Sequence, residues 1–137
     1  MLKSVYPNQL MSEVYWGFYG GRYECMEKFI REVTDYNKEL NKEWYPNQTI
    51  LNCPKVTIQY SYWNNENENV EEKDFDLEAD NQSSFTAGEL LFKIHNHVVD
   101  KLEEEDFRFF EGLTLWKRKR KTLSSTPLYF INQVELT

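Results

Sequence analysis

The chain has few of the residues that build disulfide frameworks, metal centres and phosphate-binding loops. Its 137 residues include only two cysteines, two histidines and five glycines. Cys25 and Cys53 lie far apart and form no Cys-x-x-Cys pair, so neither a disulfide scaffold nor a zinc site is indicated. Neither a glycine-rich phosphate loop nor an internal repeat is present. We therefore expect reduced thiols, no cofactor and no bound metal.

The sequence also lacks a long apolar run. No segment approaches the roughly 18 apolar residues of a membrane span. Residues 1–16 lack the continuous apolar stretch of a signal peptide. These absences lead us to expect a cytoplasmic protein that binds no membrane.

Basic residues are scarce in the middle of the chain. The formal net charge is −7, and residues 1–63 contribute nothing to it, with seven acids and seven bases. Residues 64–106 hold fourteen acids and three lysines, a net charge of −11, whereas residues 107–137 hold six bases and two acids, a net charge of +4. This distribution argues against nucleic-acid binding and favours a basic protein partner. The alternative is an acidic surface that binds no partner and contacts only solvent.

Two helices are predicted from apolar spacing. Apolar residues recur every three or four positions over residues 22–44, and this stripe includes Cys25, which we expect to be a small core residue. The second helix covers residues 86–102. Thr86 and Glu89 there form a candidate capping box, and Phe85 and Leu90 stand at the positions of a hydrophobic staple.

Strands are predicted from alternation. They cover residues 14–18, 56–63, 75–77, 107–115 and 128–131, with an exposed loop at residues 64–73 and an irregularity at Glu111 and Gly112. Residues 117–121 form a basic run expected to lie on an edge strand, and residues 123–127 read as a turn. The predicted order is β-α-β-β-α-β-β. We expect one two-layer α+β domain over residues 1–137, with two main helices packed on a four- or five-stranded antiparallel or mixed sheet.

The two histidines do not form a metal site. His95 and His97 are two positions apart on the predicted helix, so their side chains diverge by about 200°. His95 borders the apolar stripe and is expected to be a core histidine with satisfied hydrogen bonds. One alternative function is nevertheless a small carboxylate-dependent hydrolase, for which His95 and Glu111 are the candidates.

Three segments resemble a known group of proteins. EVYWGFYGGRYECMEKFIREV, FFEGLTLW and PLYFINQV are similar to segments of immunity proteins from bacterial polymorphic toxin systems, which act in contact-dependent or type VI secretion. The resemblance implies a cytoplasmic protein without catalytic activity that binds and neutralises a cognate toxin domain. Some families of this kind accompany toxins with nuclease domains.

If the resemblance holds, the acidic segments would occupy a basic toxin cleft and occlude its active site. Exposed tryptophans would anchor that interface. A non-catalytic adaptor or homodimerising scaffold remains a further alternative, and the oligomeric state is open. The candidate partner-binding residues are Glu66, Glu68, Glu71, Glu72, Asp74, Asp76, Glu103, Glu104, Glu105, Asp106, Trp63 and Trp116.

Overall fold

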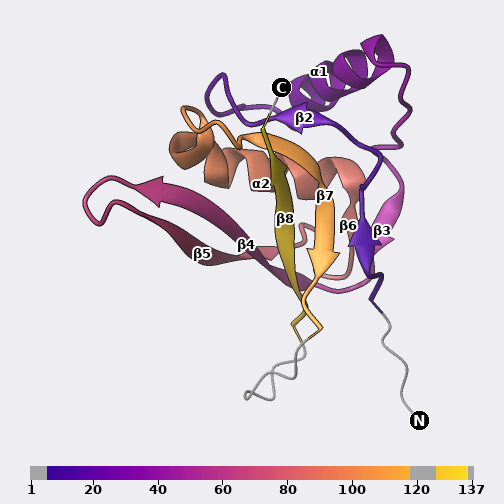
Figure 1. The fold of residues 1–137 in the computed structure, drawn as a ribbon. Helices are drawn as coiled ribbons and strands as arrows, with labels where there is room; N and C mark the ends of the chain where they lie inside the picture. The colour runs from indigo at the N-terminus through magenta and orange to yellow at the C-terminus, as the bar shows by residue number, and fades with distance from the viewer. Residues whose placement is uncertain (1–5, 118–125, 136–137) are drawn as a thin grey trace.

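The described part of the chain folds as an α+β protein with two helices and a mixed sheet. The computed structural model describes residues 6–117 and 126–135 (Figure 1). This confirms the predicted class and the mixed sheet. Residues 118–121 of the predicted basic run and residues 123–125 of the predicted turn lie outside the described part of the chain.

The main sheet has six strands, more than the four or five predicted. A parallel pairing of β8 with β4 joins two antiparallel parts, with β1, β2 and β7 on one side and β5 on the other. A separate two-stranded sheet pairs β3 with β6. Three of the eight strands, β1, β3 and β6, have no counterpart in the prediction because segments of two or three residues show no period. The strands are β1 (Gln9–Leu10), β2 (Trp16–Gly17), β3 (Thr49–Leu51), β4 (Lys55–Asn64), β5 (Asn69–Glu78), β6 (Phe85–Thr86), β7 (Phe109–Leu115) and β8 (Leu128–Val134).

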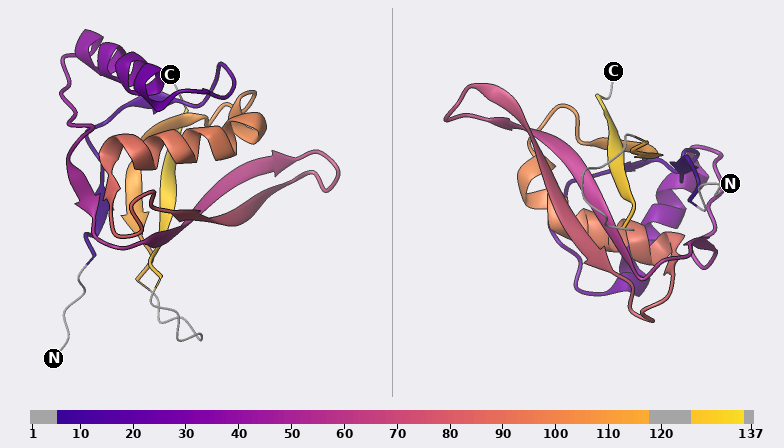
Figure 2. Two further views of the ribbon diagram at one scale, coloured as in Figure 1. Left: turned by 180° about the vertical axis from the view of Figure 1, so that it is seen from behind. Right: turned by 90° about the horizontal axis from the view of Figure 1, so that it is seen from below.

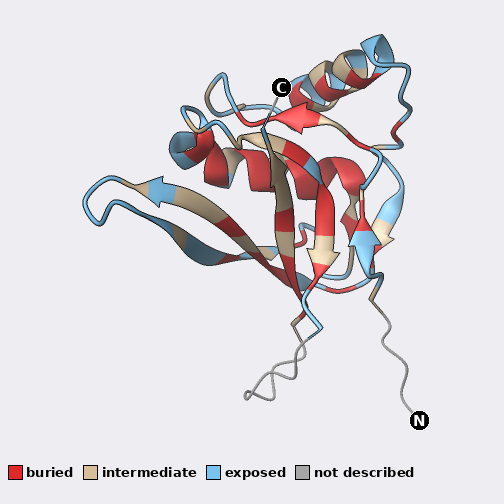
Figure 3. Cartoon of the chain, viewed as in Figure 1, coloured by how far each residue is buried: buried red, intermediate tan, exposed pale blue. Residues whose placement is uncertain are grey.

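The helices lie at different distances from the sheet. Helix α2 (Ala87–Leu102) crosses one face of the sheet and packs on β4, whereas α1 (Met26–Glu39) packs on α2 and β2 (Figures 1 and 2). Buried residues gather between α2 and the sheet (Figure 3). The opposite sheet face, turned toward the viewer in Figure 1, is crossed by no helix or strand of the described residues. We call this the outer sheet face.

Helix α1 is shorter than predicted, and Cys25 does not lie in the core. Cys25 is the N-cap residue, with extended backbone angles and an exposed side chain. The residues before it are held by α2, because Asn96 bonds the backbone of Tyr23 and Asp100 pairs with Arg22. Because of these tertiary contacts, the helix begins at Met26 and not at residue 22. At the other end the helix stops at Glu39, although the apolar spacing continues to Trp44. Phe29, further along the stripe, is fully buried.

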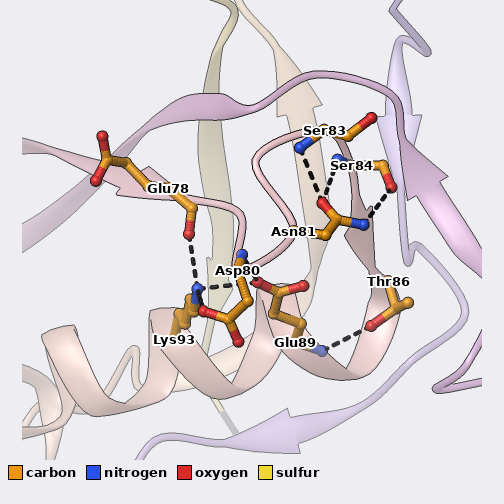
Figure 4. Close-up of polar contacts among 8 residues, drawn as sticks. All are labelled: Glu78, Asp80, Asn81, Ser83, Ser84, Thr86, Glu89 and Lys93. Atoms are coloured by element: carbon orange, nitrogen blue, oxygen red, sulfur yellow. Dashed lines mark hydrogen bonds and ion pairs between the residues drawn. The ribbon is translucent and has the colours of Figure 1, made fainter.

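Helix α2 begins where the capping signals place it. The Thr86 hydroxyl accepts a hydrogen bond from the backbone N–H of Glu89 at 3.2 Å. Phe85 and Leu90 are both fully buried, as the staple predicts. The Glu89 carboxylate does not complete the reciprocal half of the box. It accepts instead from the backbone N–H of Asp80, so it joins the helix to the chain leaving β5 (Figure 4).

Strands β4 and β5 form a hairpin that projects beyond the body of the molecule (Figures 1 and 2). The predicted loop at residues 64–73 is wrong in length, because β5 already begins at Asn69. A polar, acidic sequence gave no strand signal there, but pairing with β4 supplies the backbone hydrogen bonds. The predicted irregularity in β7 is confirmed. Pairing with β8 shifts between Phe110 and Leu113, where Gly112 has a φ of +96°.

Three amide side chains extend the backbone pairing where ladders end. Each donates to the C=O and accepts from the N–H of a single residue, as a neighbouring strand would. They fix the chain before α1 to both helices and the hairpin to β8. The pairs are Asn37 with Tyr15, Asn96 with Tyr23, and Gln133 with Ser61.

Candidate functional site

The acids of β5 gather on the outer sheet face. Cross-strand partners share a face of a sheet, so the register fixes where these side chains lie. Asp74 pairs with Gln59, and Gln59 is in register with Phe130 of β8. Glu72 and Asp76 flank Asp74 at alternate positions and therefore share its face. Three of the predicted partner-binding acids thus form a row on a face that no described helix or strand crosses.

Asp74 and Asp76 each accept a hydrogen bond from a β4 side chain. Asp76 accepts a hydrogen bond from the Thr57 hydroxyl at 2.6 Å and lies 3.4 Å from the Lys55 ammonium. Asp74 accepts from the Gln59 amide at 2.9 Å. The side chains of Lys55 and Asp76 are 46% and 52% exposed, so solvent screens that ion pair. The pair therefore adds little to stability.

An apolar pair occupies the same face near the tip of the hairpin. Trp63 is in register with Val70, and the two residues are 43% and 50% exposed. Glu66 and Glu68 are exposed in the turn beyond them. The tip therefore combines an aromatic anchor with nearby acids. Val70 was not among the predicted residues, although its place in an otherwise polar stretch is a sequence signal.

Trp116 lies at the other end of the outer sheet face. Its ring meets that of Phe130 edge-on at 5.7 Å between centroids, and Phe130 is in register with Gln59 beside Asp74. Pairing of β7, β8, β4 and β5 thus brings residues from three distant segments onto one surface. The sequence predicted a strand at residues 128–131 but did not show that Phe130 faces outward.

Glu71 differs from the other hairpin acids. It points to the opposite face of β5 and accepts hydrogen bonds from the Tyr62 hydroxyl and the Asn67 amide. Hydrogen bonds from Asn64, Asn67 and Tyr62 lower its pKa. Its carboxylate therefore helps to hold the hairpin turn together.

Two of the four acids at residues 103–106 bind backbone groups of distant segments. Glu103 accepts from the N–H groups of Gly20 and Gly21, both at 3.1 Å. Glu105 accepts from the N–H of Trp63 and so ties the hairpin to the end of α2. These contacts give Glu103 and Glu105 a structural role that offsets the unfavourable helix macrodipole. Glu104 and Asp106 are exposed.

His95 is a core histidine, as predicted. It is fully buried and makes two hydrogen bonds, accepting from the Trp16 indole N–H at Nδ1, at 3.0 Å, and donating from Nε2 to the Gly21 carbonyl, at 2.8 Å. The indole can only donate, so it fixes this tautomer. Burial lowers the pKa of His95. No ring nitrogen is left for a substrate.

The candidate catalytic pair is not assembled in one cavity. Glu111 lies on the rim of an open pocket of about 350 Å³ lined by Trp16 and Tyr36, and His95 does not line it. His97, exposed on another side of α2, stacks on the Phe75 ring at 3.7 Å. Within residues 6–117 and 126–135, no group of three His, Cys, Asp or Glu side chains is placed to hold a metal ion.

Lys93 joins β5 to α2 (Figure 4). Its ammonium donates to the Glu78 carbonyl at 2.6 Å, to Asp80 at 2.7 Å and to Glu89 at 2.9 Å. Burial acts to lower the pKa of Lys93, but the hydrogen bonds and charges of Asp80 and Glu89 outweigh it and raise the pKa. The lysine stays charged and acts as a structural clamp, not as a nucleophile.

Comparisons with known protein families, curated protein sequences and solved structures find no match for this chain. Among the described residues, no helix is long and apolar enough to cross a membrane.

Proposed function

We propose that this chain is a protein-binding domain that neutralises a basic toxin domain by covering its active site. The observation that carries the proposal is the juxtaposition on the outer sheet face, where Glu72, Asp74 and Asp76 form a row between Trp63 and Trp116. The resemblance of three sequence segments to immunity proteins supplies the class of partner.

The arrangement suits recognition of a positively charged cleft. Carboxylates that remain exposed steer a basic partner toward the surface and accelerate association. The projecting hairpin reaches into a concave partner, and the exposed Trp63 supplies the large apolar contact that anchors many interfaces (Figure 1). The acids act mainly on the rate of association, and the aromatic residues act mainly on the lifetime of the complex.

The proposal places the chain in the cytoplasm, where it protects the cell that makes it. Its activity is binding, and the toxin domain is the catalyst. The first experiment expresses the variable C-terminal domain of a secreted protein encoded beside this gene, with and without this chain. Growth rescue together with a stable purified complex supports the proposal. Continued toxicity and the absence of a complex contradict it.

The second experiment tests the surface. Glu72→Lys with Asp74→Lys reverses two acids of the row, and association with the purified toxin domain is followed by stopped-flow fluorescence. We expect the association rate to fall on the order of tenfold at low ionic strength and the difference to shrink at high salt. The dissociation rate should change much less.

A matched control separates the surface from the net charge. Glu24→Lys with Glu39→Lys changes the net charge equally, at two exposed acids without a side-chain hydrogen bond or ion pair to another described residue. This variant should retain an association rate within about twofold of the wild type. Equal slowing in both variants would assign the effect to net charge and remove the hairpin from the mechanism.

A further inference from the structure

A second concave surface lies between β2, α1 and the start of β7. Two adjoining hollows of about 350 and 370 Å³ share Trp16 and Tyr36 as walls. Volumes of this size are typical of ligand sites. We call this surface the aromatic groove. Its aromatic lining residues include Tyr15, Trp16, Tyr19, Tyr23, Tyr36 and Phe109.

The charged side chains that line the two hollows are all acidic. Lys42 and Arg108, which line neither hollow, lie over rings of the groove. Glu111 and Glu135 lie at one hollow and Glu32 and Asp35 at the other, and no lysine or arginine occurs among the described residues that line either. Glu32 accepts a hydrogen bond from a tyrosine hydroxyl. The side chains of Asp35, Glu111 and Glu135 form no hydrogen bond or salt bridge with another described residue. Three carboxylates are therefore available to a cationic ligand.

The rings of the groove already attract cations. The Lys42 ammonium lies 5.4 Å from the centroid of Tyr15. The Arg108 guanidinium carbon lies 5.8 Å from the centroid of Tyr19 and 5.1 Å from that of Phe109. These distances are within the range of a cation–π interaction. Aromatic faces beside unpaired carboxylates form a site that favours an ammonium or guanidinium group over a neutral side chain.

The walls of the groove are held by hydrogen bonds and ring contacts within the protein. The Asn37 amide bonds both backbone groups of Tyr15, at 2.9 Å each. The Trp16 indole is held by the fully buried His95, and its ring meets that of Tyr36 edge-on at 5.7 Å. A ligand therefore loses little affinity to reordering of the protein.

We propose that the aromatic groove binds arginine or lysine side chains of an extended basic segment of a partner protein. Positive charge satisfies the three carboxylates, the long alkyl stems of these residues match the apolar walls, and the adjoining hollows accept two successive basic side chains. The groove lies apart from the hairpin and is composed of other residues. The inference therefore stands or fails independently of the function proposed for the outer sheet face.

The test uses a capped pentapeptide with two arginines spaced by glycines, and a twin in which citrulline replaces each arginine. Binding is measured by calorimetry and by shifts of the backbone amide signals in NMR spectra. We expect the arginine peptide to bind with a Kd on the order of 0.1–1 mM and to shift the signals of Tyr15 and Tyr36. The citrulline peptide, which has a similar shape but no charge, should not bind detectably.

Variants then locate the site. Asp35→Asn with Glu111→Gln should weaken binding of the arginine peptide on the order of tenfold, and circular dichroism checks that the fold is retained. Asp74→Asn with Glu72→Gln removes the same charge from the hairpin and should leave the affinity within about twofold. The inference is overturned if the wild type does not bind the peptide, if citrulline binds equally well, or if the hairpin variant weakens binding as much as the groove variant.

Discussion

Replacing His95 with leucine tests the buried contact that joins α2 to β2 and the following turn. Leucine has a similar volume, so the main effect is the loss of two hydrogen bonds and not the creation of a cavity. The Trp16 indole N–H would lose its acceptor and the Gly21 carbonyl its donor. A buried polar group left without a partner costs about 1–3 kcal/mol. Trp16 is only 7% exposed, whereas Gly21 is partly accessible to water.

We therefore expect His95→Leu to lower the free energy of unfolding by about 2–4 kcal/mol, measured by urea denaturation followed by tryptophan fluorescence. Trp16→Phe supplies the matched control because it removes the donor. The double variant should be more stable than the sum of the single losses predicts, by about 1–3 kcal/mol, since no unpaired indole N–H remains. Simple additivity would refute the hydrogen bond as the source of the effect.

The same contact makes stability depend on pH. Burial lowers the pKa of His95, while the bond to Gly21 and the charge of Glu103 partly oppose the shift. The unfolded chain, with a histidine pKa of about 6.5, then binds a proton before the folded chain does. Stability is therefore fully present above about pH 6.5 and is lost as the pH falls toward the lowered pKa of the folded state, at up to about 1.4 kcal/mol per pH unit.

The pH dependence is measured by urea denaturation between about pH 5 and about pH 8. Burial, Lys73 and Arg22 lower the pKa of His97, so His97 contributes with the same sign. The comparison is therefore made in a His97→Gln background. There His95→Leu should flatten the loss of stability below about pH 6.5. An unchanged slope would show that another group carries the dependence and would refute the assigned tautomer and burial.

Three further predictions concern stability and are measured by chemical denaturation. Gly112→Ala should lower the free energy of unfolding by about 3 kcal/mol, because its φ is +96° and a Cβ would lie 2.8 Å from the Cα of Ser12. Gly20→Ala, which has open space around it, should lower it by only about 1 kcal/mol. Equal losses would contradict the close approach at Gly112. Thr86→Ala removes the N-cap of α2 and should cost about 1 kcal/mol, and no loss would show that the cap is dispensable. Asn37→Leu removes three backbone hydrogen bonds at a fully buried site and should cost about 2–4 kcal/mol, and a loss below about 1 kcal/mol would contradict this role.

The features of the fold that could be predicted are those set by neighbouring residues in the chain. The start of α2 follows from Thr86, which bonds the helix backbone in the structure, and the irregularity in β7 follows from Gly112. Helix α1 was predicted too long at both ends, because residues 22–25 were counted in it and because the apolar spacing continues to Trp44, past the last helical residue Glu39. Spacing records which residues are apolar. It contains no information on a distant amide, such as that of Asn96, that holds the backbone in another conformation.

The candidate site was also predictable only in part. An acidic surface on the hairpin was foreseeable from residues 64–80, and Glu72 and Asp74 lie on it. The separate role of Glu71 on the other face, and the backbone contacts of Glu103 and Glu105, were not foreseeable. A carboxylate that accepts from a backbone N–H tens of residues away has the same sequence pattern as one exposed to water.

The sequence by itself determined the class of fold, the cap and apolar face of α2, the hairpin of β4 and β5, and the buried place of His95. Each of these depends on neighbours within a few positions, where spacing and turn chemistry act directly. Only the tertiary structure decided that β8 pairs in parallel with β4 and sets Phe130 beside Gln59 and Asp74. It alone also formed the aromatic groove. Both surfaces arise from contacts between distant segments, because strand register and helix packing, unlike local preference, are fixed only when the whole core is assembled.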